Sequence, residues 1–140
     1  MRANDDFAEG WNVEAELRDA NSVLAFWRKA LAVRKTHEAL VSSYLLCSYK
    51  FTTSIQIYGD FYPLIPEHST IFTYTRSLAG TTVLVVLNFS VEEVTVKISL
   101  KNPSNIPKRI VLSNYRAGFV EEFDDGDTLT VRGYEGLIYV

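Results

Sequence analysis

The sequence predicts a mainly β fold, an antiparallel β-sandwich preceded by one amphipathic helix. Three observations lead to this fold class. Apolar residues recur at helical spacing over residues 22–38. After residue 57 the chain changes to short segments rich in β-branched and aromatic residues. Residues that favour turns separate these segments at short intervals, as in sandwich folds.

The helix is predicted over residues 22–38, with its apolar residues on one face. This face consists of Val23, Phe26, Trp27, Ala30 and Leu31. Asn21 or Ser22 is expected to cap the first turn, and Asp19 adds negative charge at the positive end of the helix dipole. The last turn carries the cationic residues Arg34, Lys35 and His37. Because the apolar face is large and aromatic, we expect it to pack against a large surface.

Seven strands are predicted after the helix. They cover residues 58–64, 70–76, 81–89, 91–100, 109–114, 128–132 and 134–140. Residues 81–89 are almost continuously apolar, which is typical of a central strand buried on both faces. Residues 91–100 alternate, with Val94, Val96 and Ile98 on one face. Ala79-Gly80 predicts a hairpin turn before residue 81.

Charge and composition exclude several classes of partner. The net charge is −3, and no cluster of Lys and Arg is longer than a pair, so neither nucleic acid nor an anionic membrane is expected as a partner. No apolar stretch approaches the ~18 residues that a membrane helix needs. Cys47 is the single cysteine and cannot form an internal disulfide, and residues 1–10 do not resemble a secretory signal. A cytoplasmic location is therefore expected.

The residues do not predict a catalytic, substrate-binding, metal-binding or cofactor-binding site. Glycoside hydrolysis needs two carboxyl groups that face each other. The adjacent acidic pairs are Glu92-Glu93, Glu121-Glu122 and Asp124-Asp125, and neighbours on a strand or in a turn do not converge. Residues 124–127 lack the spaced ligands of a calcium loop and predict an acidic turn. His37 and His68 have no ligand-spaced partners, so we expect a helix-end charge and a loop residue.

Two further features have competing interpretations. Asn88-Phe89-Ser90 matches a glycosylation sequon, but Asn88 ends a buried-looking strand, which favours a structural role in a turn. A group of aromatic residues can either stack on sugar rings or pack in the core, and core packing is the expected outcome. The group consists of Tyr58, Phe61, Tyr62, Phe72 and Tyr74.

The order of segments resembles the C-terminal end of the α-glucosidases and oligo-1,6-glucosidases of glycoside hydrolase family 13, in the α-amylase superfamily, and is most similar to fungal maltases. Seven segments carry the resemblance. They are residues 1–7; 11–13 with Glu16; 21–29 with 31–35; 58–61; 71–76; 84–90; and 112–115 with 134–136. This chain departs from the family pattern at Gly133, where a Pro is usual, and at Gly136, where an Ala is usual. We expect these glycines to loosen the last strand slightly.

The resemblance implies a division of the chain and a partner. Residues 1–41 would be the tail end of a catalytic (β/α)8 barrel, with 22–38 as its last helix, and residues 58–140 the C-terminal β-sandwich domain. The catalytic Asp, Glu and Asp lie upstream in the family, so this chain is expected to be inactive alone. The intact enzyme would hydrolyse α-1,4 or α-1,6 glucosidic bonds with retention, and the missing barrel would be the partner of this chain. The barrel would also provide its only contact with an α-glucoside substrate.

Residues 42–57 fit neither a helical nor a strand pattern, and the resemblance isolates them. Joining Val41 to Tyr58 restores an uninterrupted family-like connection. We interpret these sixteen residues as a translated, unspliced intron; a genuine loop insertion is the alternative. Two other functions stay open, a stand-alone carbohydrate-binding sandwich and a piece of an inert family-13-like transporter subunit.

Overall fold

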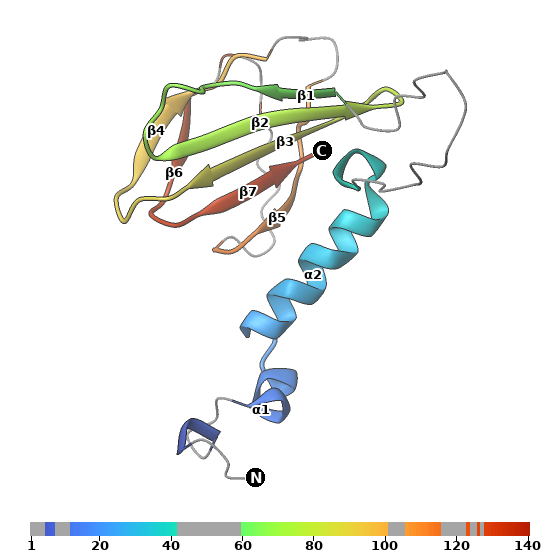
Figure 1. The fold of residues 1–140 in the computed structure, drawn as a ribbon, viewed down its shortest axis with the longest axis vertical. Coiled ribbons are helices and arrows are strands. Elements are labelled where there is room, and N and C mark those ends of the chain that lie inside the picture. Colours follow the sequence, from blue (N-terminus) through green and yellow to red (C-terminus); the bar gives the residue numbers. More distant parts are fainter. Residues whose placement is uncertain are drawn as a thin grey trace, which may run out of the picture.

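The computed structural model describes residues 5–7, 12–41, 60–100, 106–115, 123, 126 and 128–140. Its main body is an antiparallel β-sandwich of two sheets (Figure 1). The larger sheet has five strands in the order β1-β2-β3-β7-β5, and the smaller pairs β4 with β6. The strands are β1 (Asp60–Pro63), β2 (Ile71–Leu78), β3 (Thr81–Asn88), β4 (Val94–Lys97), β5 (Ile110–Ser113), β6 (Thr128–Val131) and β7 (Gly136–Tyr139). The predicted fold class is confirmed.

All seven predicted strands are present, most of them shorter than expected. The β2–β3 hairpin turns at Ala79 and Gly80, which have φ values of 49° and 82°. Positive φ at both central residues is typical of the tight turns that match the twist of paired strands. Residues 42–57, 121–122, 124–125 and 127, which were singled out in the sequence, lie outside the described residues.

Strand β3 is buried on both faces, as its apolar run predicted. Leu84 and Val86 point into the sandwich and belong to the main core, which joins the two sheets. Val83 and Val85 point to the opposite face, where they pack with Ala39. The alternation in β4 is also confirmed, because Val96 is buried between exposed Thr95 and Lys97.

The helical part differs from the prediction in two respects. A short helix, α1 (Val13–Arg18), precedes the predicted one, and its N-cap is Asn12, whose side chain accepts the Ala15 N–H at 2.9 Å. An asparagine before an acidic first turn is typical of a helix start. The helix was nevertheless not predicted, because six residues are too few to show a helical period. The predicted helix is α2 (Val23–Thr36), which ends two residues earlier than expected.

The cap of α2 is Ser22, one of the two candidates. Its hydroxyl accepts the Ala25 N–H at 3.1 Å and donates to the Glu16 carbonyl at 2.7 Å. The carboxylate of Asp19 accepts the N–H of Asn21 at 2.8 Å, just before the helix, so its favourable charge at the helix start stays a prediction. Glu16 of α1 brings its carboxylate to the Leu24 N–H at 2.9 Å. The N-terminus of α2 is therefore fastened to α1.

Two short 3-10 helices complete the fold, η1 (Asp5–Phe7) and η2 (Glu38–Leu40). Ala39 of η2 is buried against the outer face of the five-stranded sheet, together with the β3 residues Val83 and Val85. Figure 1 shows α2 running from α1 up to η2, which meets the sheet beside β2 and β3. The contact of η2 thus anchors the C-terminal end of α2 to the sandwich.

Candidate functional site

The helix α2 has two different faces, and these organise the candidate functional site. One face is directed towards the edge strand β5 and includes Ser22, Phe26 and Val33. Residues spaced by three or four positions share a face of a helix, so these side chains lie in one row. The predicted apolar face is therefore divided, because Phe26 is half-buried on the sheet side while other members are left uncovered.

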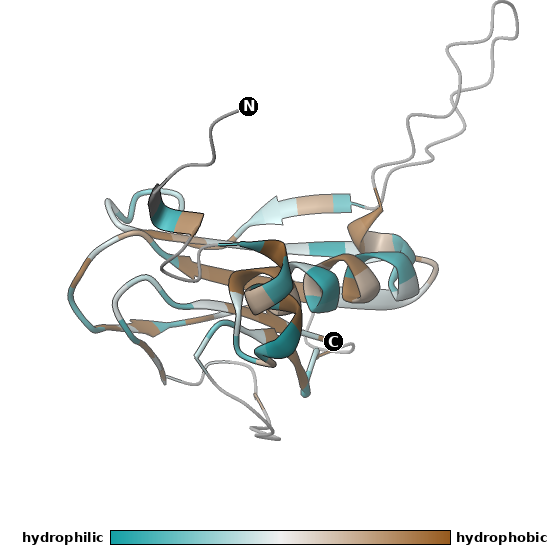
Figure 2. Cartoon of the chain, turned by 90° about the horizontal axis from the view of Figure 1, so that it is seen from below, coloured by the Kyte–Doolittle hydropathy of each residue, from teal (hydrophilic) through white to brown (hydrophobic). Residues whose placement is uncertain are grey.

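The uncovered face of α2 is an apolar stripe formed by Val23, Trp27 and Leu31, which we call the α2 stripe. Their exposed fractions are 64%, 59% and 49%. The preceding helix adds two exposed apolar residues, Val13 and Leu17. Figure 2 shows α2 side-on, with polar and apolar residues on different sides of the helix. Large apolar side chains at this density on a helix mark a surface that normally has a partner.

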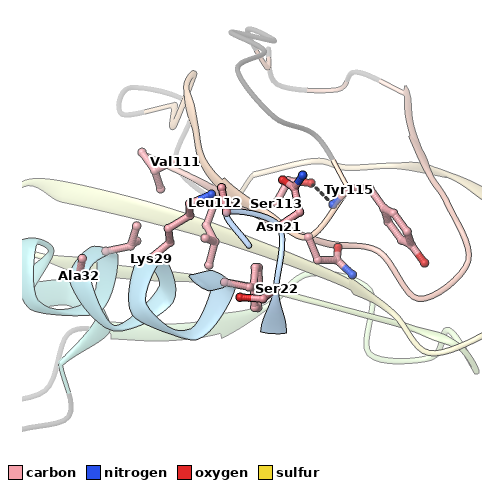
Figure 3. A pocket seen from close by; sticks show the side chains of 12 residues that line it. Asn21, Ser22, Lys29, Ala32, Val111, Leu112, Ser113 and Tyr115 are labelled. Atoms are coloured by element: carbon pink, nitrogen blue, oxygen red, sulfur yellow. Dashed lines mark hydrogen bonds between the residues drawn. The ribbon is translucent and has the colours of Figure 1, made fainter. Parts of the chain in front are cut away.

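A cavity of about 510 Å³ lies between α2 and β5 (Figure 3). Its apolar lining comes from Phe26 and Val33 of the helix and from Val111 and Leu112 of the strand. Its polar lining consists of Asn21, Ser22, Lys29, Ser113, Asn114 and Tyr115. Sequence reasoning did not find this cavity, although two of the seven family-like segments, 21–29 and 112–115, meet here.

The other part of the last family-like segment, 134–136, is joined to the strand side of this cavity by Asn114. The Asn114 Nδ2 donates to the Tyr134 carbonyl at 2.8 Å, and the Gly136 N–H donates to Asn114 Oδ1 at 2.9 Å. These two bonds hold Tyr134 in a left-handed conformation, with φ of 56°. Segments 112–115 and 134–136 are therefore one structural unit, and the Asn114 amide is fully engaged within it.

One of the three predicted acidic pairs, Glu92-Glu93, lies within the described residues. Glu92 and Glu93 are exposed, as expected for solvated strand ends. The other two predicted pairs lie outside the described residues. Among the described acidic residues, Glu135 is buried, with 1% of its surface exposed. Its carboxylate accepts the Arg132 N–H at 2.9 Å within the same turn. Its role there is to close the 132–135 turn.

No group of three or more His, Cys, Asp or Glu side chains that could hold a metal ion occurs among the residues the structure describes. His68 has a structural role in the loop before β2. Its Nδ1 accepts the N–H groups of Thr70 at 3.3 Å and Ile71 at 3.1 Å. His37 follows α2, where its backbone N–H donates to the Val33 carbonyl at 3.2 Å.

Asn88 has the structural role predicted for it. The side chain is 3% exposed, and its Nδ2 donates to the carbonyls of Glu92 at 2.8 Å and Arg132 at 2.9 Å. Its Oδ1 accepts both the N–H and the hydroxyl of Ser90. An amide engaged in this way joins the end of β3 to the turns after β3 and β6, and it is inaccessible to a glycosylating enzyme in the folded chain.

The aromatic group was expected in the core, and this expectation was wrong for several members. Phe61, Tyr62 and Phe72 are exposed, with Phe61 at 54% and Phe72 at 46%. Strands β1 and β2 lie at one edge of the sheet, and none of the described elements covers these rings. The Tyr74 ring lies 5.0 Å from Phe61 and 5.2 Å from Phe72, tilted by 39° and 48°. Rings tilted by these angles do not form one flat stacking platform. Tyr58 lies outside the described residues.

Tyr74 and Arg76 form a partly buried polar pair beside these rings. Burial raises the pKa of the Tyr74 hydroxyl above its ordinary value of 10.0, and the nearby Arg76 charge partly opposes this shift. The Nε–H of Arg76 is buried and has no hydrogen-bond partner among the described residues. A buried donor without a partner is unfavourable, so the hydrogen bonding of this face is incomplete within the described residues, and only part of the face is covered by η2.

None of the described helices is long and apolar enough to cross a bilayer.

No family model matches the sequence. Individual proteins do match it. The chain is 31% identical over 138 residues to oligo-1,6-glucosidase IMA3 of Saccharomyces cerevisiae, and 32% identical over 140 residues to α-glucosidase MAL32 of the same yeast. Each alignment covers 98% of this chain and 20% of the relative.

Relatives also occur in bacteria. The oligo-1,6-glucosidase of Parageobacillus thermoglucosidasius is 27% identical over 131 residues, which cover 91% of this chain. The chain thus spans about a fifth of the length of the curated relatives it matches.

Solved structures show the same fold. Trehalose-6-phosphate hydrolase of Bacillus licheniformis superposes with a TM-score of 0.72 at 20% identity, over 99% of this chain and 21% of that one. Isomaltulose synthase of Erwinia rhapontici NX5 superposes with a TM-score of 0.70 at 24% identity and the same coverage. The arrangement of helix and sandwich therefore recurs in larger enzymes.

Proposed function

Because this chain is homologous to the C-terminal part of the family 13 α-glucosidases and oligo-1,6-glucosidases, we propose that it is the non-catalytic, barrel-covering portion of an α-glucosidase. The enzyme as a whole would hydrolyse α-1,4 or α-1,6 glucosidic bonds of maltose-type or isomaltose-type oligosaccharides with retention. The two carboxyl groups for this reaction would come from the catalytic barrel.

The observation that carries this proposal is the α2 stripe. The helix is anchored to the sandwich at η2 and along β5, yet Val23, Trp27 and Leu31 on its other side have no cover among the described residues. Because these side chains are about half exposed, covering them would contribute roughly 1–2 kcal/mol each. A barrel that packs against this stripe would sandwich α2 between two bodies, which explains why the helix is apolar on two sides.

The exposed aromatic residues on the outer face of β1 and β2 are a second support. Phe61 and Phe72 are exposed there, beside the buried Nε–H of Arg76, which has no hydrogen-bond partner in the described part of the chain. Exposed aromatic rings together with an unsatisfied donor are typical of a surface that another part of a protein completes.

Two other functions compete with this one. A stand-alone carbohydrate-binding sandwich would use the exposed aromatic residues, but the tilts between Phe61, Tyr74 and Phe72 do not favour a flat platform. A piece of an inert transporter subunit would share the architecture. However, the relatives that match at 31–32% identity are named as glucosidases, which argues against a transporter subunit. We therefore favour the glucosidase.

The proposal is tested by replacing the matching fifth of yeast α-glucosidase MAL32 with this chain and measuring hydrolysis of maltose. We expect an active chimera, and inactivation when Trp27→Asp and Leu31→Asp are introduced together, because charges then face the barrel. A chimera carrying Glu93→Ala is the matched control and should stay active. Full activity of the double Asp chimera would contradict docking through the α2 stripe.

The isolated chain should not hydrolyse α-glucosides. Hydrolysis of maltose by the purified 140-residue chain, at a rate above that of buffer, would overturn its assignment as non-catalytic.

A further inference from the structure

The cavity between α2 and β5 has the size of a small-molecule site. Its volume of about 510 Å³ falls within the range of ligand-binding clefts, roughly 300–1,000 Å³. It exists because α2 is anchored by η2 at its C-terminal end, while its N-terminal half lies beside β5. Strand β5 is an edge strand that pairs only with β7 in the described sheet, so its outer side borders the cavity.

The polar groups of the lining divide into engaged and available ones. Ser22 caps α2, and both ends of the Asn114 amide are bonded within the β5–β7 unit. In contrast, the Asn21 amide, the Lys29 ammonium and the Tyr115 hydroxyl make no interaction with any residue that the structure describes. Figure 3 shows Lys29 extending from α2 towards β5. Three available polar groups thus belong to the lining, Asn21 and Lys29 on the helix side and Tyr115 after β5.

The chemistry of this lining narrows the class of ligand. Lys29 is the single charged residue of the lining, and no carboxylate is present, which disfavours a metal cation. The floor of Phe26, Val33, Val111 and Leu112 favours a ligand with an apolar surface, whereas the available groups need hydrogen-bond partners. A pyranose has C–H groups on its ring faces and hydroxyls on its edge, so it satisfies both requirements.

We propose that this cavity is a non-catalytic saccharide-binding site for a mono- or disaccharide. Lys29 and Asn21 bind hydroxyl groups of the sugar, and the 52% exposed ring of Tyr115 covers one of its faces. The lining alone indicates a saccharide. That this saccharide is an α-glucoside rests on the proposed function. Ligand sites occur preferentially at domain interfaces, and in the proposed enzyme the cavity lies at the junction of barrel helix and sandwich.

The test is an NMR amide-shift titration of the complete chain with glucose, maltose and isomaltose. We expect saturable shifts at Val111, Leu112 and Tyr115, with Kd in about the millimolar range for at least one sugar. Lys29→Met and Tyr115→Ala should each weaken binding about tenfold or more. Lys35→Met, an exposed lysine of the same helix, and Phe72→Ala, an exposed ring elsewhere, should leave Kd within about twofold.

Three results would overturn the proposal. They are the absence of saturable shifts at these amides, a loss of binding on Phe72→Ala but not on Tyr115→Ala, and binding of inorganic phosphate in place of the sugars. Far-UV circular dichroism of each variant establishes that the fold is kept. Because Lys29 and Tyr115 lie off the α2 stripe, loss of sugar binding leaves barrel docking intact, so the two proposals fail separately.

Discussion

The backbone of Gly133 lies against the carbonyl of Val91, so closely that a Cβ at position 133 would be 2.1 Å from the Val91 oxygen. The neighbouring Tyr134 N–H donates to the Ser90 carbonyl at 2.9 Å, which holds the two turns together. Position 133 therefore requires glycine for space. The absence of a side chain is what lets the turns meet, and the expectation that this glycine loosens the last strand stays a prediction.

This contact predicts a contrast between two glycines. Gly133→Ala should lower the free energy of unfolding by about 3 kcal/mol, because backbone atoms must move apart. Gly136→Ala should change it by less than about 1 kcal/mol, since the nearest atom is the Leu87 Cδ2 at 3.1 Å, the end of a flexible side chain. Urea unfolding of both variants measures the contrast, and equal losses would contradict the steric explanation.

The Asn88 amide predicts a second sensitive position. Asn88→Ala should destabilise the chain by about 2–4 kcal/mol, because the carbonyls of Glu92 and Arg132 and the N–H of Ser90 lose a buried partner. The exposed neighbour Glu93 supplies the control, with Glu93→Ala expected within about 0.5 kcal/mol of the parent. Thermal unfolding of both variants gives the comparison, and a similar Tm for Asn88→Ala and the parent would exclude the proposed role.

The α2 stripe predicts self-association of the isolated chain. Replacing Trp27 and Leu31 with serine should shift the chain towards monomer with little loss of stability, because both side chains are already exposed. Phe26→Ser should instead lower the Tm, since this side chain is half-buried on the sheet side of the same helix. Light scattering coupled to size exclusion reports the association state. A parent chain that is monomeric at high concentration would refute this prediction.

Tyr74 predicts a loss of stability at alkaline pH. Its pKa is raised in the folded chain, so its contribution is complete below the ordinary value of 10.0 and is lost as the pH rises through the raised pKa. Arg76→Gln should raise the Tyr74 pKa further, because the Arg76 charge lowers it. NMR titration of ring-labelled tyrosine measures both values, and Tyr74→Phe identifies the resonance. A lower Tyr74 pKa in Arg76→Gln would contradict the assigned cause.

The interpretation of residues 42–57 as a translated intron stays a prediction. It predicts a transcript in which the codon of Val41 is followed directly by that of Tyr58. Sequencing of transcripts from the source organism provides the measurement. An abundant transcript that keeps the segment in frame, or genomic DNA without a splice donor at this point, would instead establish a genuine insertion.

Periodicity was sufficient to predict the long elements of the fold. The apolar run of 81–89 identified β3 as a central strand, and the alternation of 91–100 identified the buried face of β4. The helix α1 was missed because six residues do not show a period. The contact of the Glu16 carboxylate with the Leu24 N–H was also missed, because Glu16 reaches Leu24 only through the turn between two helices.

The arrangement of the candidate site, in contrast to the long elements of the fold, could not be predicted from the sequence. The resemblance identified the segments 21–29, 112–115 and 134–136, but nothing in their order indicated that the first two enclose a cavity or that Asn114 joins the last two. The exposed position of Phe61 and Phe72 was also missed, because a large aromatic residue on a strand is usually buried and only the neighbouring elements decide whether it is covered.

The sequence by itself determined the fold class, the resemblance to the α-glucosidases and the two candidates for the cap of α2, because these follow from periodicity, the order of segments and the type of side chain before the helix. Only the tertiary structure decided which part of the helix stays uncovered, that Gly133 admits no side chain, and that Asn21, Lys29 and Tyr115 line one cavity. These properties depend on distances between residues that are far apart in the chain. Such distances follow from how the helix packs on the sheet, and local patterns do not encode them.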